Sequence, residues 1–321
     1  MSNFINKENC SDLKEFYIPY RKTLDLPDNV TFGLEVEFKM DPFNDSYKSN
    51  FIDEDNAARV FMKDIGYDYN YDVECEINNH IELVSPVLTD NDKTWEELDN
   101  ILTFIKNNDG YYSGKCGAHI HVGKNILNSN SAWLNFFKLW YVFEDDIFRF
   151  TNGENYRLRE NGDYKAAKIA NACKNIIKDY NTFKDIDISY LSSNKLVAVN
   201  FPSPLKCEDF SNLLKTNSDP KANNILNTVE FRSPNGTINP VIWQNNVNFF
   251  TKFMLSCANK NLDTEKLDYL YNSKSYATVD DLAYFVFKDE FDKKCFLRQY
   301  YKDFDNPDFK IRGTKSKPFW K

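Results

Sequence analysis

TFGLEVEFKM, residues 31–40, alternates apolar side chains with two glutamates, Glu35 and Glu37. Successive side chains of a β-strand point to opposite faces, so this pattern predicts a strand with both carboxylates on one face and the apolar side chains on the other. A pair of acids on one face of a sheet is either solvated, as one face of many antiparallel sheets is, or part of a chemical site. Taken alone, the pair favours the solvated interpretation, and the rest of the chain decides.

The same pattern recurs in three later stretches that also predict strands. Residues 67–88 predict a hairpin, residues 115–124 (KCGAHIHVGK) a strand bracketed by glycines, and residues 228–233 (TVEFRS) a further strand. On one face they carry Asp72, Glu74, Glu76 and Glu82 in the hairpin, His119 and His121 in the second stretch, and Glu230 and Arg232 in the third. Several strands are therefore expected to present such side chains on one side.

This shared face consists almost entirely of carboxylates, imidazoles and a guanidinium, whereas a solvated face would also use Thr, Ser, Lys and Gln. Carboxylate oxygens are the ligands that Mg²⁺ and Mn²⁺ prefer, and a neutral imidazole is compatible with Mn²⁺. Arginine offers a planar fork for phosphate oxygens. Crowded acids repel one another, which a bound cation relieves. Taken together the stretches favour a divalent-metal and phosphate site, although each one alone is explained as well by structural or surface contacts.

The bulk composition restricts the protein class. The 321 residues are 42% hydrophobic and 16% aromatic, enough for a sizeable core, and we expect one large domain. The net charge is -8, so the chain lacks the excess of basic residues that is typical of nucleic-acid-binding proteins, and we expect no nucleic-acid partner. Seven scattered cysteines without a CxxC pair indicate free thiols in a reducing compartment. With no signal peptide and no apolar run of about 18 residues, we expect a soluble cytoplasmic protein without a membrane partner.

Apolar periodicity predicts the helices. The expected ranges are 52–65, 90–107, 129–150, 164–180, about 240–259 and 279–288, with a helix plus loop in 205–226 and a strand at 195–201. Asn239 is expected to cap the helix that Pro240 begins. The acids Glu144 to Asp146, near the end of the 129–150 helix, are interpreted as a solvated patch, and residues 1–30 as a loose lead-in.

Four motifs together resemble a known family. TFGLEVEF, IELVSP, CGAHIHVG and VEFRSPNGTIN, in this order, resemble the motifs of the amidoligases, which belong with glutamine synthetase and glutamate–cysteine ligase. The resemblance implies an α+β fold: a curved, mainly antiparallel sheet with helices on its convex face and the active site in its concave face. The resemblance covers about residues 31–260, the expected catalytic domain. The expected lead-in (1–30) and a helical extension (261–321), which we expect to pack on the same domain and to end in a basic tail, carry no matching motif.

The resemblance also implies roles for individual residues. The metal ligands would be Glu35, Glu37, Glu74 or Glu76, Glu82, His119 and Glu230. The nucleotide phosphates or the substrate would contact His121, Arg157, Arg159 and Arg232, and Arg232 would stabilise the transferred phosphoryl group. The family shows an Asp-Gly-Ser type of turn where this chain has DVECEI, so the choice among Asp72, Glu74 and Glu76 stays open.

The implied activity is amide-bond formation. An ATP-dependent carboxylate–amine ligase with two or three Mg²⁺ or Mn²⁺ ions would form an acyl phosphate on a carboxylate substrate, and an amine, such as an amino acid or a peptide, would then displace phosphate. Two alternatives remain. One is another metal-dependent enzyme, such as a phosphotransferase of the guanidino-kinase type or a hydrolase, and the other is a nucleotide-binding module without turnover.

Overall fold

The computed structural model of the protein combines one main sheet with several helices. It describes residues 13, 15–39, 71–76, 80–107, 110–112, 116–152, 166–182, 186–187, 190–191, 195–200, 206–207 and 227–302. Within them, six strands form an antiparallel sheet in the order β2-β3-β1-β4-β8-β6. The strands are β1 (Phe32–Lys39), β2 (Asp72–Glu76), β3 (His80–Val84), β4 (Ala118–Gly123), β6 (Val199–Asn200) and β8 (Thr228–Phe231). A separate pair joins β5 (Ile186–Asp187) and β7 (Lys206–Cys207).

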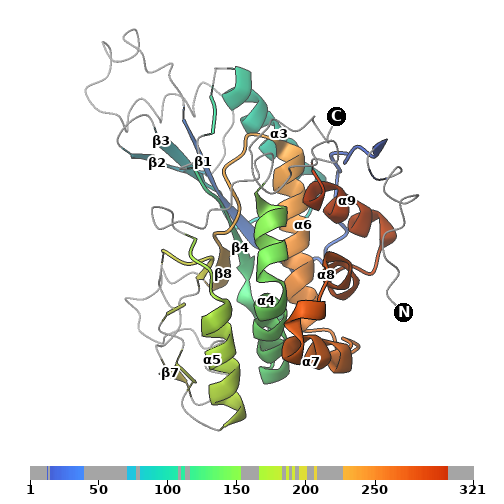
Figure 1. Cartoon of the computed structure of the whole chain (residues 1–321). Coiled ribbons are helices and arrows are strands. Elements are labelled where there is room, and N and C mark those ends of the chain that lie inside the picture. The colour runs from blue at the N-terminus through green and yellow to red at the C-terminus, as the bar shows by residue number, and fades with distance from the viewer. Residues whose placement is uncertain are drawn as a thin grey trace.

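The helices pack alongside this sheet and against one another. They are α3 (Asp92–Asn107), α4 (Asn130–Thr151), α5 (Ala170–Asn181), α6 (Pro240–Cys257), α7 (Thr264–Asn272), α8 (Val279–Val286) and α9 (Glu290–Tyr300). Figure 1 shows α4 and α6 side by side next to the sheet, with α7, α8 and α9 beyond them. The described chain is therefore α+β, with a layer of helices on the sheet.

The apolar face of the sheet packs directly onto these helices. The Phe231 ring of β8 stacks on Phe250 of α6 at 4.1 Å between centroids and on Trp140 of α4 at 6.0 Å. At the other end, Phe32 of β1 stacks on Trp95 of α3 at 5.4 Å. Burying such rings supplies much of the driving force for folding, so this face of each strand is committed to the core. The opposite face is left for polar chemistry.

Several helix predictions are confirmed with small shifts at their ends. The ranges 90–107, 129–150, 240–259 and 279–288 correspond to α3, α4, α6 and α8. The predicted cap of α6 is present, because the Asn239 side chain accepts a hydrogen bond from the backbone N–H of Val241. The range 52–65 lies outside the described residues, as does all of 205–226 except the two residues of β7.

Other predicted ranges differ from the structure. The helix expected from residue 164 begins only at Ala170. The strands expected at 195–201 and 228–233 are limited to β6 and β8. Helices α7 and α9 lie in the segment predicted as a helical extension, but no ranges were predicted for them, although Asp263 and Asp289 cap them by accepting backbone hydrogen bonds.

The prediction that Glu144 belongs to a solvated patch is wrong. Glu144 is only 2% exposed. Its Oε1 accepts hydrogen bonds from the backbone N–H groups of Ile169 and Ala170, at 2.5 and 3.0 Å, and from Trp140 Nε1 at 3.0 Å. The first turn of a helix has backbone N–H groups without partners inside the helix, and a carboxylate is a strong acceptor for them. Glu144 of α4 therefore caps the start of α5, and burial raises its pKa.

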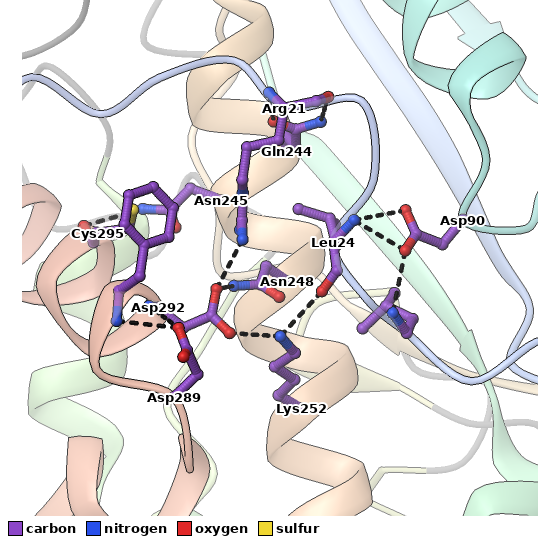
Figure 2. A network of polar contacts seen from close by, with 12 residues as sticks. Arg21, Leu24, Asp90, Gln244, Asn245, Asn248, Lys252, Asp289, Asp292 and Cys295 are labelled. Atoms are coloured by element: carbon purple, nitrogen blue, oxygen red, sulfur yellow. Dashed lines mark hydrogen bonds and ion pairs between the residues drawn. The ribbon is translucent and has the colours of Figure 1, made fainter.

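Part of the N-terminal segment is also held firmly rather than loosely. Leu24 is fully buried, and its backbone N–H donates to Asp90 Oδ2 at 2.8 Å. The backbone of Arg21 exchanges two hydrogen bonds of 2.7 Å with the Gln244 side chain on α6. These contacts fix the path of the chain into β1 across α6 (Figure 2).

A buried group of charges, here called the Asp292 network, joins the N-terminal segment to α6 and α9. Asp292 accepts hydrogen bonds from Arg21 NH1 at 2.8 Å, Asn248 Nδ2 at 2.9 Å and Lys252 Nζ at 2.5 Å (Figure 2). Lys252 Nζ also donates to the carbonyl oxygen of Leu24 at 3.0 Å. Burial acts to raise the pKa of Asp292, but the hydrogen bonds and charges of Lys252 and Arg21 outweigh it and lower that pKa.

Among the described residues, no helix combines the length and the apolar character that crossing a membrane requires.

Candidate active site on the open face of the sheet

The register of the sheet brings the predicted polar residues together. Glu35 of β1 lies directly opposite His119 of β4, and Glu37 lies opposite Glu82 of β3. His121 lies opposite Glu230 of β8. Directly opposed residues of neighbouring strands project their side chains from the same face. The prediction that these side chains share one face of one sheet is therefore confirmed.

We call this group the acidic cluster. Its members are Glu35, Glu37, Glu82, His119, His121, Glu230 and Arg232. Both histidines, Glu37, Glu230 and Arg232 are buried, whereas Glu35 and Glu82 are half-buried.

Glu35 is the central acceptor of the cluster. Its Oε2 lies 2.6 Å from His119 Nδ1, and its Oε1 lies 2.7 Å from His121 Nε2. Burial acts to raise the pKa of Glu35, but hydrogen bonds from His119 and His121 outweigh it and hold that pKa well below its usual value. Glu35 is thus ionised and accepts a ring N–H from each histidine.

His121 has a second neighbour on β8. Its Nδ1 lies 3.1 Å from the hydroxyl oxygen of Thr228. With Nε2–H donating to Glu35, the neutral ring leaves Nδ1 as an acceptor for the Thr228 hydroxyl. The ring is thereby fixed at both nitrogens.

Glu37 is held mainly through one of its two oxygens. Its Oε2 accepts a hydrogen bond from the backbone N–H of Gly117 at 2.7 Å and lies 3.4 Å from His80 Nε2. Hydrogen bonds with Cys116 and with Glu37 raise the pKa of His80 to about 10. The other oxygen, Oε1, lies 3.5 Å from His119 Nε2.

Both carboxylate oxygens of Glu230 accept hydrogen bonds. Arg232 NH1 donates to Oε1, and Asn200 Nδ2 of β6 donates to Oε2 at 2.7 Å. His119 Nδ1 lies 3.9 Å from Oε1, which links Glu230 to the rest of the cluster. Arg232 is 3% exposed, so its pairing with Glu230 lies in a site of low solvent access.

Glycine is required where the backbone approaches the cluster. A Cβ on Gly117 would lie 2.4 Å from His119 Nε2 and 2.9 Å from Glu37 Oε1, closer than real Cβ contacts allow. A Cβ on Gly236, in the turn after β8, would lie 2.6 Å from the Cβ of Cys116. The backbone N–H of Gly236 donates to the carbonyl oxygen of Cys116 at 2.9 Å. The segment before β4 and the turn after β8 therefore pack tightly beneath Glu37.

The chemistry of the cluster fits divalent cations. Two sets of three residues each offer ligand atoms within 4.8 Å of one another: Glu35, Glu82 and His119, and Glu35, His121 and Glu230. Among the described residues His119 Nε2 is buried without a hydrogen-bond partner, and it lies 3.5 Å from Glu37 Oε1. When Nδ1–H donates to Glu35, Nε2 carries a lone pair that faces another acceptor. Two facing acceptors repel each other unless a cation lies between them, so these residues fit the predicted metal ions.

The structure does not describe the side chains of several predicted site residues. The register pairs Glu74 with Glu82 and Glu76 with His80, but the side chains of both glutamates lie outside the described part of the molecule, as do Arg157 and Arg159. Asp72 is exposed at the start of β2.

Four residues that contact the cluster were not predicted: His80, Gly117, Asn200 and Thr228. Two of them carried a usable signal, because His80 lies two residues before Glu82 and Thr228 two residues before Glu230, so each pair shares a face of its strand.

Comparison with known proteins adds the family. No curated protein matches the chain. A family model described as "Putative amidoligase enzyme" matches residues 44–254, which are 211 of the 321 residues. The match includes Glu82, His119, His121, Glu230 and Arg232 and begins after β1, whose two glutamates join those residues through the sheet register. With most of its length matched, the chain belongs to this amidoligase family.

Proposed function

We propose that the protein is an ATP-dependent carboxylate–amine ligase that forms a peptide or isopeptide bond through an acyl phosphate. The observation that carries this proposal is the acidic cluster itself: four carboxylates, two histidines and an arginine on one sheet face of a chain in the amidoligase family. Phosphoryl transfer depends mostly on positioning and charge neutralisation, which such a face is suited to provide.

The cluster has residues for two or three Mg²⁺ or Mn²⁺ ions. Glu35, Glu82 and His119 would hold one ion, and the carboxylates of Glu35 and Glu230 would share a second, next to His121. Glu37 Oε1 and His119 Nε2 face the same space and would share a cation there. Bound cations supply charge neutralisation and orientation for the phosphate oxygens. The hydrogen bonds of Glu35 fix the orientation of both imidazole rings. Such a partner also makes an imidazole a more basic metal ligand.

The proposed reaction has two steps. The γ-phosphoryl group of ATP passes to a carboxylate oxygen of the acid substrate, and ADP leaves. The amine nitrogen then attacks the carbonyl carbon, the bond to phosphate breaks, and the amine releases a proton. Arg232, held by Glu230, would place its fork against the phosphoryl oxygens during the first step. His121, beside Thr228, would contact a nucleotide phosphate, and Arg157 and Arg159 would add phosphate or substrate contacts.

Other parts of the proposal rest on composition. The described cysteines Cys116, Cys173, Cys257 and Cys295 are free thiols, which supports a place in the reducing cytoplasm. The net charge of -8 supports small-molecule or peptide substrates rather than nucleic acid.

The deciding experiment is a product analysis. The purified protein is incubated with ATP, Mg²⁺ and a panel of acids and amines, and ADP, phosphate and product masses are measured. Ligation predicts a product with the mass of acid plus amine minus water, with one ADP and one phosphate released per amide bond. A phosphorylated guanidine would instead identify the phosphotransferase alternative. Nucleotide binding that needs no Mg²⁺ and produces no ADP would identify a binding module.

Replacement of Arg232 separates the chemical step from substrate binding. In Arg232→Lys the charge stays but the bidentate fork is lost, so we expect kcat to fall by about 10²-fold or more. Turnover at the wild-type rate would remove Arg232 from the site. Because the contact of Arg232 NH1 with Glu230 Oε1 also changes, Mn²⁺ affinity is measured in the same variant.

A further inference from the structure

A side chain from the edge of the sheet completes the support of Glu230. Asn200 lies on β6, the last strand of the sheet, directly opposite Glu230. Its Nδ2 donates to Glu230 Oε2 at 2.7 Å, and the side chain is buried, with 8% of its surface exposed. A carboxylate with only one donor can rotate about its last torsion angle, whereas donors on both oxygens fix its plane.

The two donors of Glu230 differ in kind. Arg232 brings a positive charge to Oε1, and Asn200 brings a neutral amide to Oε2. A positively charged side chain in place of Asn200 would compete with a metal ion for the Glu230 carboxylate. An acidic side chain there would repel that carboxylate. The neutral amide orients Oε2 without neutralising the negative charge of Glu230. Each carboxylate oxygen keeps a further lone pair for a ligand.

The backbone just before Asn200 is held by hydrogen bonds to two neighbouring segments. The backbone N–H of Arg232 donates to the carbonyl oxygen of Ala198 at 2.8 Å, and the N–H of Ala198 donates to the carbonyl oxygen of Ala167 at 2.9 Å. Val199, between Ala198 and Asn200, is fully buried on the core side. The short strand therefore carries Asn200 on a rigid support, as precise sites require.

From this geometry we infer that Asn200 is a positioning residue for the metal site, which holds the Glu230 carboxylate in the orientation that binds a cation. The inference rests on the proposed metal-dependent function, but its test needs neither ATP nor a ligase substrate.

The test measures Mn²⁺ binding by calorimetry and by electron paramagnetic resonance, with the metal alone and the full chain. Asn200→Leu keeps the size of the side chain and removes the donor. We expect Mn²⁺ affinity at the Glu230 position to fall about 10- to 100-fold, the usual loss when a partner of a metal ligand is removed. Asn200→Ala should give the same loss if the donor, rather than the packing of leucine, is responsible.

The matched control is Asn245→Ala. Asn245 is a buried asparagine whose Nδ2 donates to Gln299 Oε1 at 2.9 Å and to the carbonyl oxygen of Cys295 at 3.2 Å, both on α9. This variant should lower the melting temperature and leave Mn²⁺ affinity unchanged. A merely structural role for Asn200 would give the same result as this control, and that outcome would overturn the inference.

A double-mutant cycle shows whether Asn200 acts through Glu230. In a Glu230→Gln background, Asn200→Leu should change Mn²⁺ affinity no further, because the carboxylate that it orients is gone. An equal loss in both backgrounds would contradict the inference. If Mn²⁺ binding follows these expectations while no amide product is ever found, the positioning role stands and only the ligase proposal fails.

Discussion

Two buried groups of charges in this protein differ in how completely they are neutralised. In the Asp292 network a single carboxylate accepts from Arg21, Lys252 and the amide of Asn248, so positive charge exceeds negative. In the acidic cluster four carboxylates share one sheet face with Arg232 and histidines. Burying charge is costly unless it is paired. The first group is complete in itself and ties three segments together, whereas the second retains an excess of acceptors.

The comparison yields a criterion for distinguishing structural charges from functional ones. Asp292 has all of its partners within the folded chain, and its role is stability. His119 Nε2 is buried 3.5 Å from Glu37 Oε1, and the described part of the chain provides no hydrogen-bond partner for this nitrogen. Replacing residues of the two groups should therefore have opposite effects on activity and on stability.

Replacing Glu35 should abolish function and spare the fold. Glu35→Gln removes the charge that both proposed metal sets share, so activity should fall by more than the roughly 100-fold cost of losing an outer partner. Product formation and Mn²⁺ affinity are measured together with the melting temperature. The control is Glu96→Gln on the exposed face of α3. A variant that still ligates at the wild-type rate would exclude the cluster as the active site.

Replacing Asp292 should destabilise the fold and leave metal binding unchanged. Asp292→Ala leaves Arg21 and Lys252 without their acceptor, which should lower the free energy of unfolding by about 3–5 kcal/mol. Urea unfolding measures this change, and Mn²⁺ affinity of the folded protein should remain unchanged. The control is Asp268→Ala, whose pair with Lys138 has the same 2.5 Å distance but a 53% exposed carboxylate, and should cost under about 1 kcal/mol. Equal losses in both variants would refute the importance of burial.

Glu144 gives an intermediate case, a buried carboxylate satisfied by neutral donors. Glu144→Ala leaves the backbone N–H groups of Ile169 and Ala170 without an acceptor, which should cost about 1–3 kcal/mol. The neighbouring Asp145→Ala, whose side chain is 71% exposed, should stay within about 0.5 kcal/mol of wild type. Thermal unfolding of the two variants measures the difference, and a stable Glu144→Ala protein would argue against the cap.

The smallest effect concerns acid stability. The pKa of Asp292 is lower in the folded protein than its ordinary value of 3.8. A carboxylate with a depressed pKa contributes stability above its unfolded pKa, and the contribution is lost as the pH falls through the folded value. The difference in unfolding free energy between wild type and Asp292→Asn should therefore shrink only below about pH 4. A difference that persists unchanged at lower pH would contradict the ionised state of Asp292.

The local pattern was enough to predict the shared face of the acidic cluster. Alternation with period two depends only on neighbouring residues, and it placed Glu35 with Glu37, His119 with His121, and Glu230 with Arg232. Helices with strong apolar stripes and caps, such as α6 with Asn239, were predicted for the same reason. The roles of the individual cluster residues stay predictions, since their ligands have yet to be identified.

Contacts between distant segments could not be read from local patterns. The burial of Glu144 depends on the start of α5 reaching α4, and the contact of Asn200 with Glu230 depends on β6 pairing with β8. The anchoring of Leu24 depends on Asp90, 66 residues away. In each case the tertiary partner decides the environment of the side chain, which intrinsic propensities do not encode.

The order of the strands has a consequence for biosynthesis. β1 is the first strand of the sheet along the chain but lies between β3 and β4 in space, and β8 joins only beyond β4. Since a chain emerges from the ribosome N-terminus first, Glu35, Glu37 and Glu82 are released long before their partner on β8. A cation bound by both Glu35 and Glu230 can be captured only after 230 of the 321 residues have been translated. In the proposed metal-dependent enzyme, loading of this site would therefore be a late event in the maturation of the protein.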